Sequence, residues 1–164
     1  MKNINQNYIT ETHLVDTACN YLVNILKAFG SDDIIIDKKI KEDSIIFDVR
    51  GDDVGRIIGK RGSVLDAIQY LINLVVNRDV TKYFKVKINV CEYREKREKA
   101  LNLLGKKIAS RVEKTGEPYK LEAMTAYDRR IIHLAVGDFA GVKSISEGNG
   151  VNRHVVVMSA DKSL

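Results

Sequence analysis

Long apolar runs are absent from this sequence of 164 residues. No segment approaches the roughly 18 apolar residues that a membrane-spanning helix requires, and the polar N-terminus MKNINQNYITETH lacks the apolar centre of a signal peptide. We therefore expect a cytoplasmic protein that does not insert into a membrane. The apolar share of 45% and the charged share of 30% are typical of a folded globular chain.

Cysteine is also scarce. Cys19 and Cys91 are far apart and form no C-x-x-C pair, so neither a metal site nor a redox motif is supported. Both lie in segments with apolar periodicity, and we expect two buried thiols in a reducing compartment. Nothing in the sequence points to a bound cofactor.

The signatures of catalysis are missing as well. The sequence contains no G-x-S-x-G and no H-E-x-x-H motif, and its three histidines have no metal-ligand spacing. A metal pair of Glu92 and Asp128, as in a nuclease, is the alternative, but a charged helix cap beside a basic helix is the simpler account. We therefore predict that the chain is not an enzyme.

Basic charge is present and is unevenly placed. The formal net charge is +5, which suggests a polyanionic partner. Residues 85–117 hold 10 basic and 5 acidic residues, whereas residues 1–84 hold 11 and 12, and residues 118–164 hold 6 and 5. In the middle segment the signs interleave, which favours an ordinary solvated helix. The alternative is a positive bridge that carries a nucleic-acid strand from one domain to the other.

Apolar periodicity predicts a helix and two strands at the start of the chain. Between Glu11 and Phe29 the apolar residues recur at steps of three and four, and Gly30 ends the pattern. The β-branched runs 33–37 and 44–49 predict adjacent strands joined by a charged stretch. The apolar face of the helix consists of Leu14, Ala18, Leu22, Ile25 and Phe29.

Two helices and a strand complete this first unit. Asp52 or Asp53 can cap a short helix that ends at Ile58, and Ser63 can cap a longer one. Residues 84–90 alternate between apolar and polar side chains, as in a half-buried strand. The apolar stripe of the longer helix consists of Leu65, Ile68, Ile72 and Val75.

A long charged helix opens the second half and runs from Glu92 to about Lys114. Thr125 and Asp128 form a capping box for a further helix that ends near Val136. Gly148-Asn149-Gly150, between the runs 142–146 and 153–158, predicts a hairpin. The expected apolar side of the long helix consists of Ala100, Leu103, Leu104, Ile108 and Val112.

Residues 55–62 carry the strongest functional signal, because Gly59 and Gly62 flank the cations Lys60 and Arg61 between two helices. Glycine lets a backbone approach a ligand, and the amides at a helix start attract anions. Such a loop within a helix–strand–strand–helix–helix–strand order is typical of a type II KH domain, which clamps about four nucleotides. A plain glycine-capped turn with solvated charges is the alternative. The predicted nucleic-acid contacts are Arg56, Ile57, Ile58, Gly59, Lys60, Arg61 and Gly62, with the two isoleucines lining an apolar floor beneath the bases.

The same segment does not fit a nucleotide-hydrolysing P-loop. That motif needs four residues between its glycines and a Ser or Thr after the lysine. Here three residues separate Gly55 from Gly59, and Arg61 follows Lys60. We therefore exclude ATP or GTP hydrolysis.

A second set of basic residues lies on the helix that Thr125 opens. Arg129 and His133 are four residues apart and share a helix face, with Arg130 beside them. Arg153 in the last strand could extend this cationic surface, although the pattern leaves open whether Arg153 or His154 faces solvent. A solvated face with a structural histidine is the alternative interpretation.

The run Met124-Thr125-Ala126-Tyr127-Asp128-Arg129-Arg130-Ile131-Ile132-His133, followed by Ser144-Ile145-Ser146-Glu147-Gly148 and Arg153-His154-Val155-Val156-Val157, closely resembles a known single-strand-binding domain. That domain is named for an Arg and a His with three residues between them, and is called here the R-three-H domain. A type II KH domain joined to it resembles the bacterial Jag family, also known as KhpB. The resemblance covers roughly residues 12–159.

The resemblance implies RNA binding in the cytoplasm, a small partner with a single KH domain, and effects on cell shape, division or sporulation. Many members carry a further N-terminal domain. Because this chain begins almost directly at the first KH helix, we expect that domain, and roles that depend on it such as contact with membrane machinery, to be missing.

These observations together predict an α+β protein of two small domains. We expect a flexible N-terminus over residues 1–10, a type II KH domain over 11–91, and an R-three-H domain over 92–164, a small sheet packed on helices, whose connecting helix spans 92–115. The expected ligand is single-stranded RNA, with single-stranded DNA also tolerated; a homodimer is left open. A scaffold that pairs with another KH protein and a nucleic-acid-processing enzyme are the rival interpretations.

Overall fold

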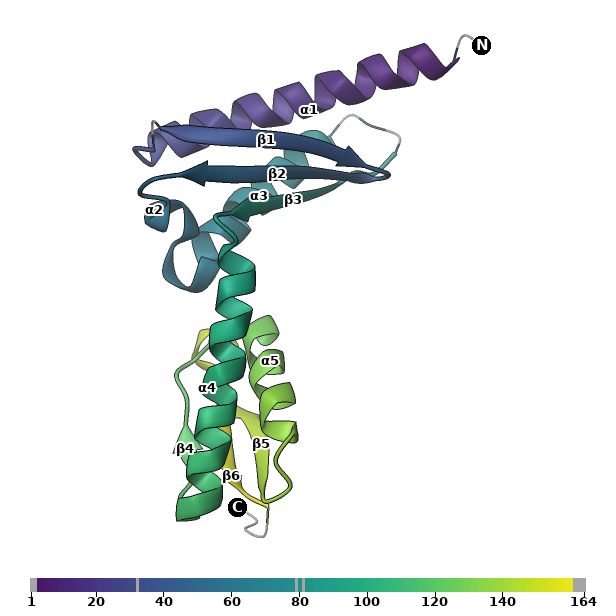
Figure 1. The fold of residues 1–164 in the computed structure, drawn as a ribbon. Coiled ribbons are helices and arrows are strands. Elements are labelled where there is room, and N and C mark those ends of the chain that lie inside the picture. Colours follow the sequence, from purple (N-terminus) through teal and green to yellow (C-terminus); the bar gives the residue numbers. More distant parts are fainter. Residues whose placement is uncertain (1–2, 32, 79, 81, 161–164) are drawn as a thin grey trace. The chain divides into compact units, whose positions relative to one another are not determined.

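The fold was obtained as a computed structural model that describes residues 3–31, 33–78, 80 and 82–160. The chain forms two compact units, residues 1–94 and 95–164, each with its own three-stranded sheet and its own core (Figure 1). Helices and strands both contribute to each unit, so the α+β class is confirmed. Among the described residues, no helix is long and apolar enough to cross a membrane.

The first unit has the element order helix–strand–strand–helix–helix–strand. The strands lie in the order β1-β2-β3, with β1 antiparallel to β2 and β2 parallel to β3. Its elements are α1 (Asn3–Ala28), β1 (Ile34–Lys41), β2 (Ser44–Gly51), α2 (Gly55–Ile58), a 3₁₀ turn (Lys60–Gly62), α3 (Ser63–Val76) and β3 (Lys85–Val90).

The core of this unit lies between one face of the sheet and the helices α1 and α3 (Figure 1). The alternation predicted for residues 84–90 is confirmed, since Val86, Ile88 and Val90 are buried and the polar residues between them are exposed. Phe47 on β2 is fully buried among them. The buried residues of the two helices are Val15, Ala18, Leu22, Leu26, Leu65, Ile68, Ile72 and Val76.

Several boundaries in the first unit differ from the prediction. Helix α1 already begins at Asn3, because residues 3–10 contain no glycine or proline and extending a helix adds one hydrogen bond per residue. The predicted flexible N-terminus is therefore helical from residue 3; residues 1–2 lie outside the described residues. Strand β1 extends through the charged stretch to Lys41, where Lys38 and Lys39 form ion pairs and lysine suits an exposed edge strand.

Cys19 and Cys91 are half-buried and form no disulfide with each other, and so the expectation of two buried thiols was wrong. Cys91 follows directly after β3, and its thiol approaches the carbonyl oxygens of Val49 and Gly51 at 3.9 and 3.8 Å. Cys19 lies at the border of the first core, where neighbouring elements cover only part of its side chain.

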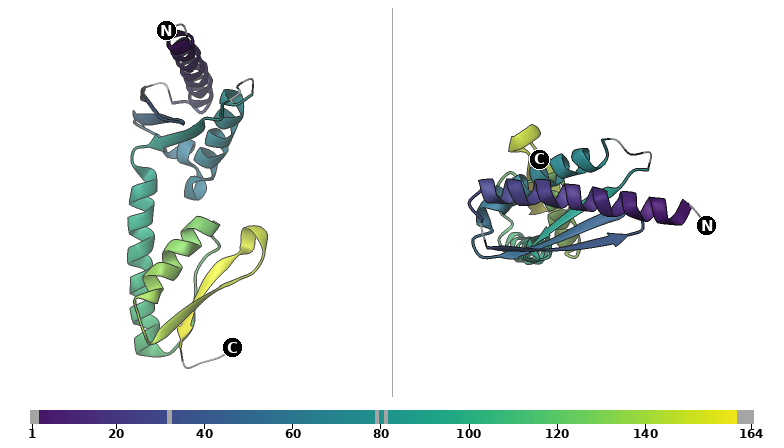
Figure 2. Two further views of the ribbon diagram at one scale, coloured as in Figure 1. Left: turned by 90° about the vertical axis from the view of Figure 1, so that its right-hand side faces the viewer. Right: turned by 90° about the horizontal axis from the view of Figure 1, so that it is seen from above.

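The second unit packs two helices on an antiparallel sheet with strand order β4-β6-β5. Its elements are α4 (Tyr93–Thr115, which starts in the first unit), β4 (Tyr119–Lys120), α5 (Ala126–Gly137), β5 (Val142–Glu147), a 3₁₀ turn (Gly150–Asn152) and β6 (His154–Ser159). The predicted hairpin forms, with Val142 opposite Ser159 and Glu147 opposite His154. Figure 2 shows α5 lying along this hairpin.

The buried face of α4 differs from the predicted one. Leu103 is 69% exposed and Leu104 is 40% exposed, although both were expected in the core. Gly105 explains the change, because a Cβ built there would lie 2.8 Å from the Cβ of Ala135. The small residue lets α4 and α5 approach closely, and the face centred on it becomes the buried one. That face consists of Leu101, Gly105, Ile108, Ala109 and Val112.

Candidate nucleic-acid interface

The glycine loop joins α2 to α3 through three residues with positive φ. Gly59 has φ 69° and ψ −174°, Arg61 has φ 58° and ψ 27°, and Gly62 has φ 85° and ψ 8°. The Gly59 conformation is essentially restricted to glycine, whereas the left-handed conformation of Arg61 is uncommon for a residue with a side chain. The loop backbone is therefore tightly specified.

Both glycines are also required by close packing within the unit. A Cβ on Gly59 would lie 2.3 Å from Cγ2 of Val64, and one on Gly62 would lie 3.0 Å from the ring of Tyr93. The sequence pattern suggested that these glycines serve approach to a ligand. The contacts show a requirement that is internal to the protein.

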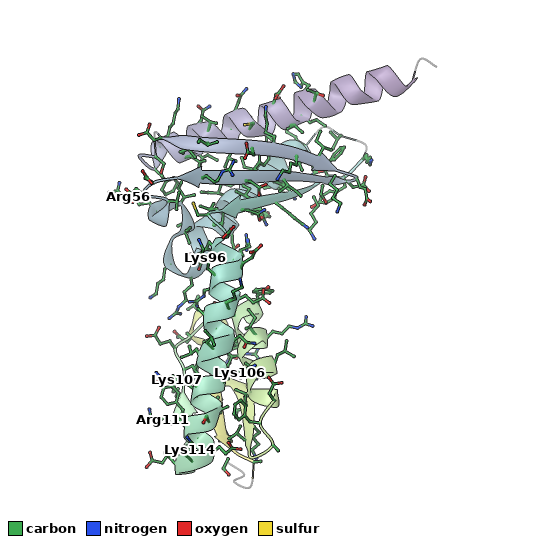
Figure 3. The ribbon with its side chains drawn as sticks, in the orientation of Figure 1. Arg56, Lys96, Lys106, Lys107, Arg111 and Lys114 are labelled. Carbon is green, nitrogen blue, oxygen red and sulfur yellow. The ribbon has the colours of Figure 1, made fainter. Side chains whose placement is uncertain are left out.

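The side chains of the loop divide into exposed cations and supporting apolar residues. Lys60 and Arg56 are exposed, Arg61 is half-buried, and Figure 3 shows Arg56 projecting from α2. Ile58 is half-buried, but Ile57 has no exposed surface and belongs to the core. Ile57 was predicted to line the floor beneath the bases; because it faces inward, it can only support the loop from below.

The start of α3 has no side-chain cap. Gly62 occupies the N-cap position and has no side chain with which to accept a hydrogen bond from the first-turn amides. The predicted caps Ser63 for α3 and Asp52 or Asp53 for α2 are therefore wrong: Ser63 is already inside α3, because the 3₁₀ turn runs straight into it, and the N-cap of α2 is Val54. The Ser63 amide donates to the Lys60 carbonyl oxygen within the 3₁₀ turn, and the dipole of α3 places positive partial charge beside the loop.

The first two residues of α4 pack near the loop and were not predicted to do so. The Tyr93 ring lies against Gly62. The Arg94 guanidinium forms a 2.9 Å ion pair with Asp66, the acidic residue in the first turn of α3. No local pattern indicates either contact, because about thirty residues separate the partners.

In the second unit, Arg129 and His133 lie on one face of α5, as the spacing predicted. The Arg129 guanidinium donates to the carbonyl oxygen of Met124 at 2.9 Å. The His133 ring lies 2.7 Å from Ser144 Oγ through Nδ1 and 2.8 Å from Ser146 Oγ through Nε2. Both ring nitrogens are thus held by β5, which fixes the orientation of the imidazole.

The two serines are site residues that our sequence reasoning did not single out. They alternate on β5, so both project to the side of the strand that meets α5. The Ser-x-Ser spacing within Ser144-Ile145-Ser146-Glu147-Gly148 could have indicated them, because alternate residues of a strand face the same side. Burial lowers the pKa of His133, and the nearby Arg129 charge lowers it further. At neutral pH the imidazole is therefore uncharged.

The remaining predicted residues occupy different environments. Arg130 and Arg153 are exposed, whereas His154 is buried and lies 2.9 Å from the Asn152 carbonyl oxygen through Nδ1. The strand pattern had left open which of residues 153 and 154 faces solvent, and the structure shows that Arg153 does. Among the residues that the structure describes, the His154 Nε2 atom has no hydrogen-bond partner, and it lies 3.9 Å from a carboxylate oxygen of Glu147.

Asp128 has a structural partner. Its side chain is 6% exposed and accepts a 3.0 Å hydrogen bond from the Arg97 guanidinium, while its backbone N–H donates to the Thr125 hydroxyl at 3.2 Å. The predicted Thr125 cap is thus confirmed. Among the residues that the structure describes, no group of three or more His, Cys, Asp or Glu side chains is placed to hold a metal ion.

Both units match the models of known domain families. A family model described as "KhpA/KhpB, KH domain" matches residues 20–88, and one for the R-three-H domain matches residues 99–159. The class is therefore that of proteins in which a KH domain precedes an R-three-H domain. These domain types are associated with single-stranded nucleic acids.

Curated proteins named RNA-binding protein KhpB are similar over most of this chain. The one from Clostridium symbiosum is 39% identical over 145 residues, which cover 88% of this chain and 65% of that protein. The one from Bacillus subtilis (strain 168) is 34% identical over 140 residues, or 84% of this chain and 66% of that protein. The chain belongs to the KhpB family, and it spans just under two thirds of the length of these two relatives.

Proposed function

We propose that this chain binds single-stranded RNA through two surfaces, the glycine loop of the first unit and the Arg129–His133 face of the second. The observation that carries the proposal is the loop itself, in which Lys60 is exposed beside the uncapped start of α3. Exposed cations at the positive end of a helix bind phosphate oxygens. The KhpB relatives are named as RNA-binding proteins, which supports the same ligand class.

In this proposal the two surfaces have different roles. Lys60, Arg61 and Arg56 contact the phosphate backbone, and Ile58 offers an apolar edge to a base. Arg130 and Arg153 add cationic contacts on the second unit, whereas Arg129 and His133 are held by Met124 and the β5 serines and position the surface. Because the contacts are mainly ionic, single-stranded DNA is also tolerated and sequence preference is limited.

The test replaces Lys60 and Arg61 together by glutamine and measures affinity for a fluorescently labelled single-stranded RNA. We expect affinity to fall at least about tenfold, because two charge-assisted phosphate contacts are lost. The matched control is the Lys41→Gln, Lys85→Gln variant, which removes the same charge. Lys41 and Lys85 both align with Ser44, at the end of the sheet opposite the loop.

Equal losses in the two variants would show that only total charge matters and would overturn the loop assignment. Circular dichroism of each variant checks the fold. We further propose that the chain binds RNA without cleaving it. Incubation of the labelled RNA with the protein and Mg²⁺ or Mn²⁺ tests this, and reproducible cleavage would contradict it. The links to cell shape, division and sporulation stay predictions.

A second candidate function is pairing with another KH domain. It is favoured by the outward face of α3, where Tyr70, Leu71 and Leu74 are 63, 51 and 50% exposed. Exposed apolar groups of this size often mark interaction surfaces. The occupant would be a small single-KH protein or a second copy of this chain. Sedimentation of Leu71→Glu, Leu74→Glu protein, alone and with such a partner, separates this role from RNA binding, which the substitutions should leave intact.

A further inference from the structure

The solvent-facing side of α4 carries a row of cations that the two proposed surfaces do not use. Residues 96, 99, 103, 107, 110 and 114 follow one another at steps of three and four, which places them on one helix face. This face lies opposite the buried face centred on Gly105. We call it the α4 stripe; it consists of Lys96, Lys99, Leu103, Lys107, Ser110 and Lys114, and Arg111 borders it.

The acidic residues of α4 lie off this face. At about 100° per residue, Glu95, Glu98 and Glu113 are roughly a quarter turn or more from the centre of the stripe. Glu98 accepts a 3.0 Å hydrogen bond from the Tyr127 hydroxyl, and the carboxylate of Glu113 lies beside Gly141. The six positions of the α4 stripe therefore contain no acidic residue.

Three lysines of the α4 stripe differ in pairing from Lys106, which lies beside it. Lys106, next to the stripe, pairs with Asp138 at 3.4 Å. Lys99, Lys107 and Lys114 form no ion pair with any residue that the structure describes. The Arg111 guanidinium is stacked over the Tyr119 ring, 5.2 Å from its centroid, and so is held at the border of the stripe. Figure 3 labels Lys96, Lys107, Arg111 and Lys114 along the helix.

Such a row is unfavourable for an isolated helix. Like charges three or four residues apart each cost a few tenths of a kcal/mol, and the pairs Lys107/Arg111 and Arg111/Lys114 have this spacing. A ligand with repeated negative charges along a line relieves the repulsion. The row extends over about 27 Å, from the 1.5 Å rise per residue of a helix.

We propose that the α4 stripe is a third nucleic-acid surface, which binds the phosphate backbone of single-stranded RNA. Its length fits a linear polyanion and exceeds what a single phosphate or headgroup needs. Insertion into a membrane surface would require an apolar face, and the stripe has only Leu103. Lysines act as point charges without base readout, so this contact is independent of sequence. The inference rests on the proposed function, because the ligand is the same RNA.

The test variant changes Lys99, Lys107 and Lys114 to glutamine in the full chain. We expect weaker binding to a labelled single-stranded RNA, by about tenfold or more near 0.1 M salt. We also expect the slope of log K against log salt to be less steep by about 2, since each phosphate contact on a single strand contributes about 0.7. The Lys→Arg variant at the same positions should keep both values. The Lys41→Gln, Lys85→Gln, Lys87→Gln variant is the charge-matched control, on the sheet of the first unit.

The outcomes separate this inference from the proposed function. If loop substitutions at Lys60 and Arg61 weaken binding but the α4 variant has unchanged affinity and salt slope, the stripe is not an RNA surface and the proposed function stands. If the wild-type chain binds no single-stranded RNA, both fail. If the α4 variant loses binding only to vesicles of anionic lipid, and not to RNA, the ligand assignment is overturned. An equal loss in the charge-matched control also overturns it.

Discussion

At the residue scale, Gly59 is the most constrained position of the loop. It combines a backbone conformation that is essentially restricted to glycine with a Cβ position only 2.3 Å from Val64 Cγ2. We expect Gly59→Ala to lower the free energy of unfolding by about 1–3 kcal/mol from backbone strain, with the steric clash adding to this. Urea denaturation of the full chain measures it.

A substitution at Val64 tests whether the steric clash contributes to this loss of stability. Val64→Ala removes the Cγ2 atom that a Cβ at Gly59 would meet, so the double variant Gly59→Ala, Val64→Ala should recover part of the loss relative to the sum of the single changes. Strict additivity would contradict the clash and leave only the backbone conformation as the cause.

His133 makes stability depend on pH. Its pKa is lowered in the folded state by burial and by Arg129, so the unfolded chain binds the proton more readily. The contribution of this group is fully present above the ordinary histidine pKa of about 6.5. It decreases as the pH falls from there to the folded-state pKa.

We therefore expect the difference in unfolding free energy between wild type and His133→Gln to decrease between pH 7.5 and pH 5.5. Urea titrations at several pH values measure this difference. His13→Gln, at an exposed position on α1, is the control. A difference that stays constant over this range would show that His133 has the same pKa in both states.

At the element scale, the contact between α4 and α5 depends on Gly105. A valine at this position would collide with Ala135, and overpacking of this kind typically costs about 1–3 kcal/mol. We expect Gly105→Val to lower the thermal midpoint. Gly137→Ala, where a Cβ would meet nothing within 4 Å, should be neutral or stabilising. A Gly105→Val protein as stable as wild type would contradict the close approach.

The same helix shows what the sequence could and could not predict. The lengths of α4 and α5 and the Thr125 cap followed from local patterns, because helix periodicity and capping are read within a few residues. The buried face of α4 did not follow from local patterns. Gly105 has no apolar side chain to mark that face, although α4 packs there against Ala135 of α5. The absence of acidic residues from the α4 stripe could be recognised only once that face was known.

The candidate site was predictable to a similar extent. The loop cations and the Arg129–His133 spacing are local, and the structure places them as expected on exposed or half-buried positions. The burial of Ile57, the role of Ser144 and Ser146, and the contact of Tyr93 with Gly62 depend on tertiary packing. Helix α2 has only four residues, which is too short for apolar spacing to indicate which side faces the core.

At the scale of the whole molecule, the two units carry separate candidate surfaces on one chain. Two weak sites gain affinity when one strand engages both, by a factor on the order of 10²–10⁴. We expect affinity to rise steeply between a short oligonucleotide of about four nucleotides, which fills one KH site, and RNAs several times longer. Fluorescence anisotropy over a length series measures the rise.

Variants at either surface should flatten this length dependence. Lys60→Gln with Arg61→Gln removes contacts in the first unit, and Arg130→Gln with Arg153→Gln removes exposed charges in the second. Each double variant should bind long RNA much more weakly than the wild type does. Its affinity for a short oligonucleotide should fall far less, because the unchanged unit still binds that oligonucleotide. Equal affinities for short and long RNA in the wild type would mean that the surfaces bind separate strands.

The packing of Val64 and Tyr93 against the two loop glycines has a consequence for maps of mutational tolerance. A library selected for folding alone should reject nearly every substitution at positions 59 and 62 and accept many at position 60, while position 61, in the left-handed region, should favour asparagine and glycine. A library selected for RNA capture should reject changes at position 60 as well. The difference between the two maps, and not either map alone, identifies the residues that contact the ligand.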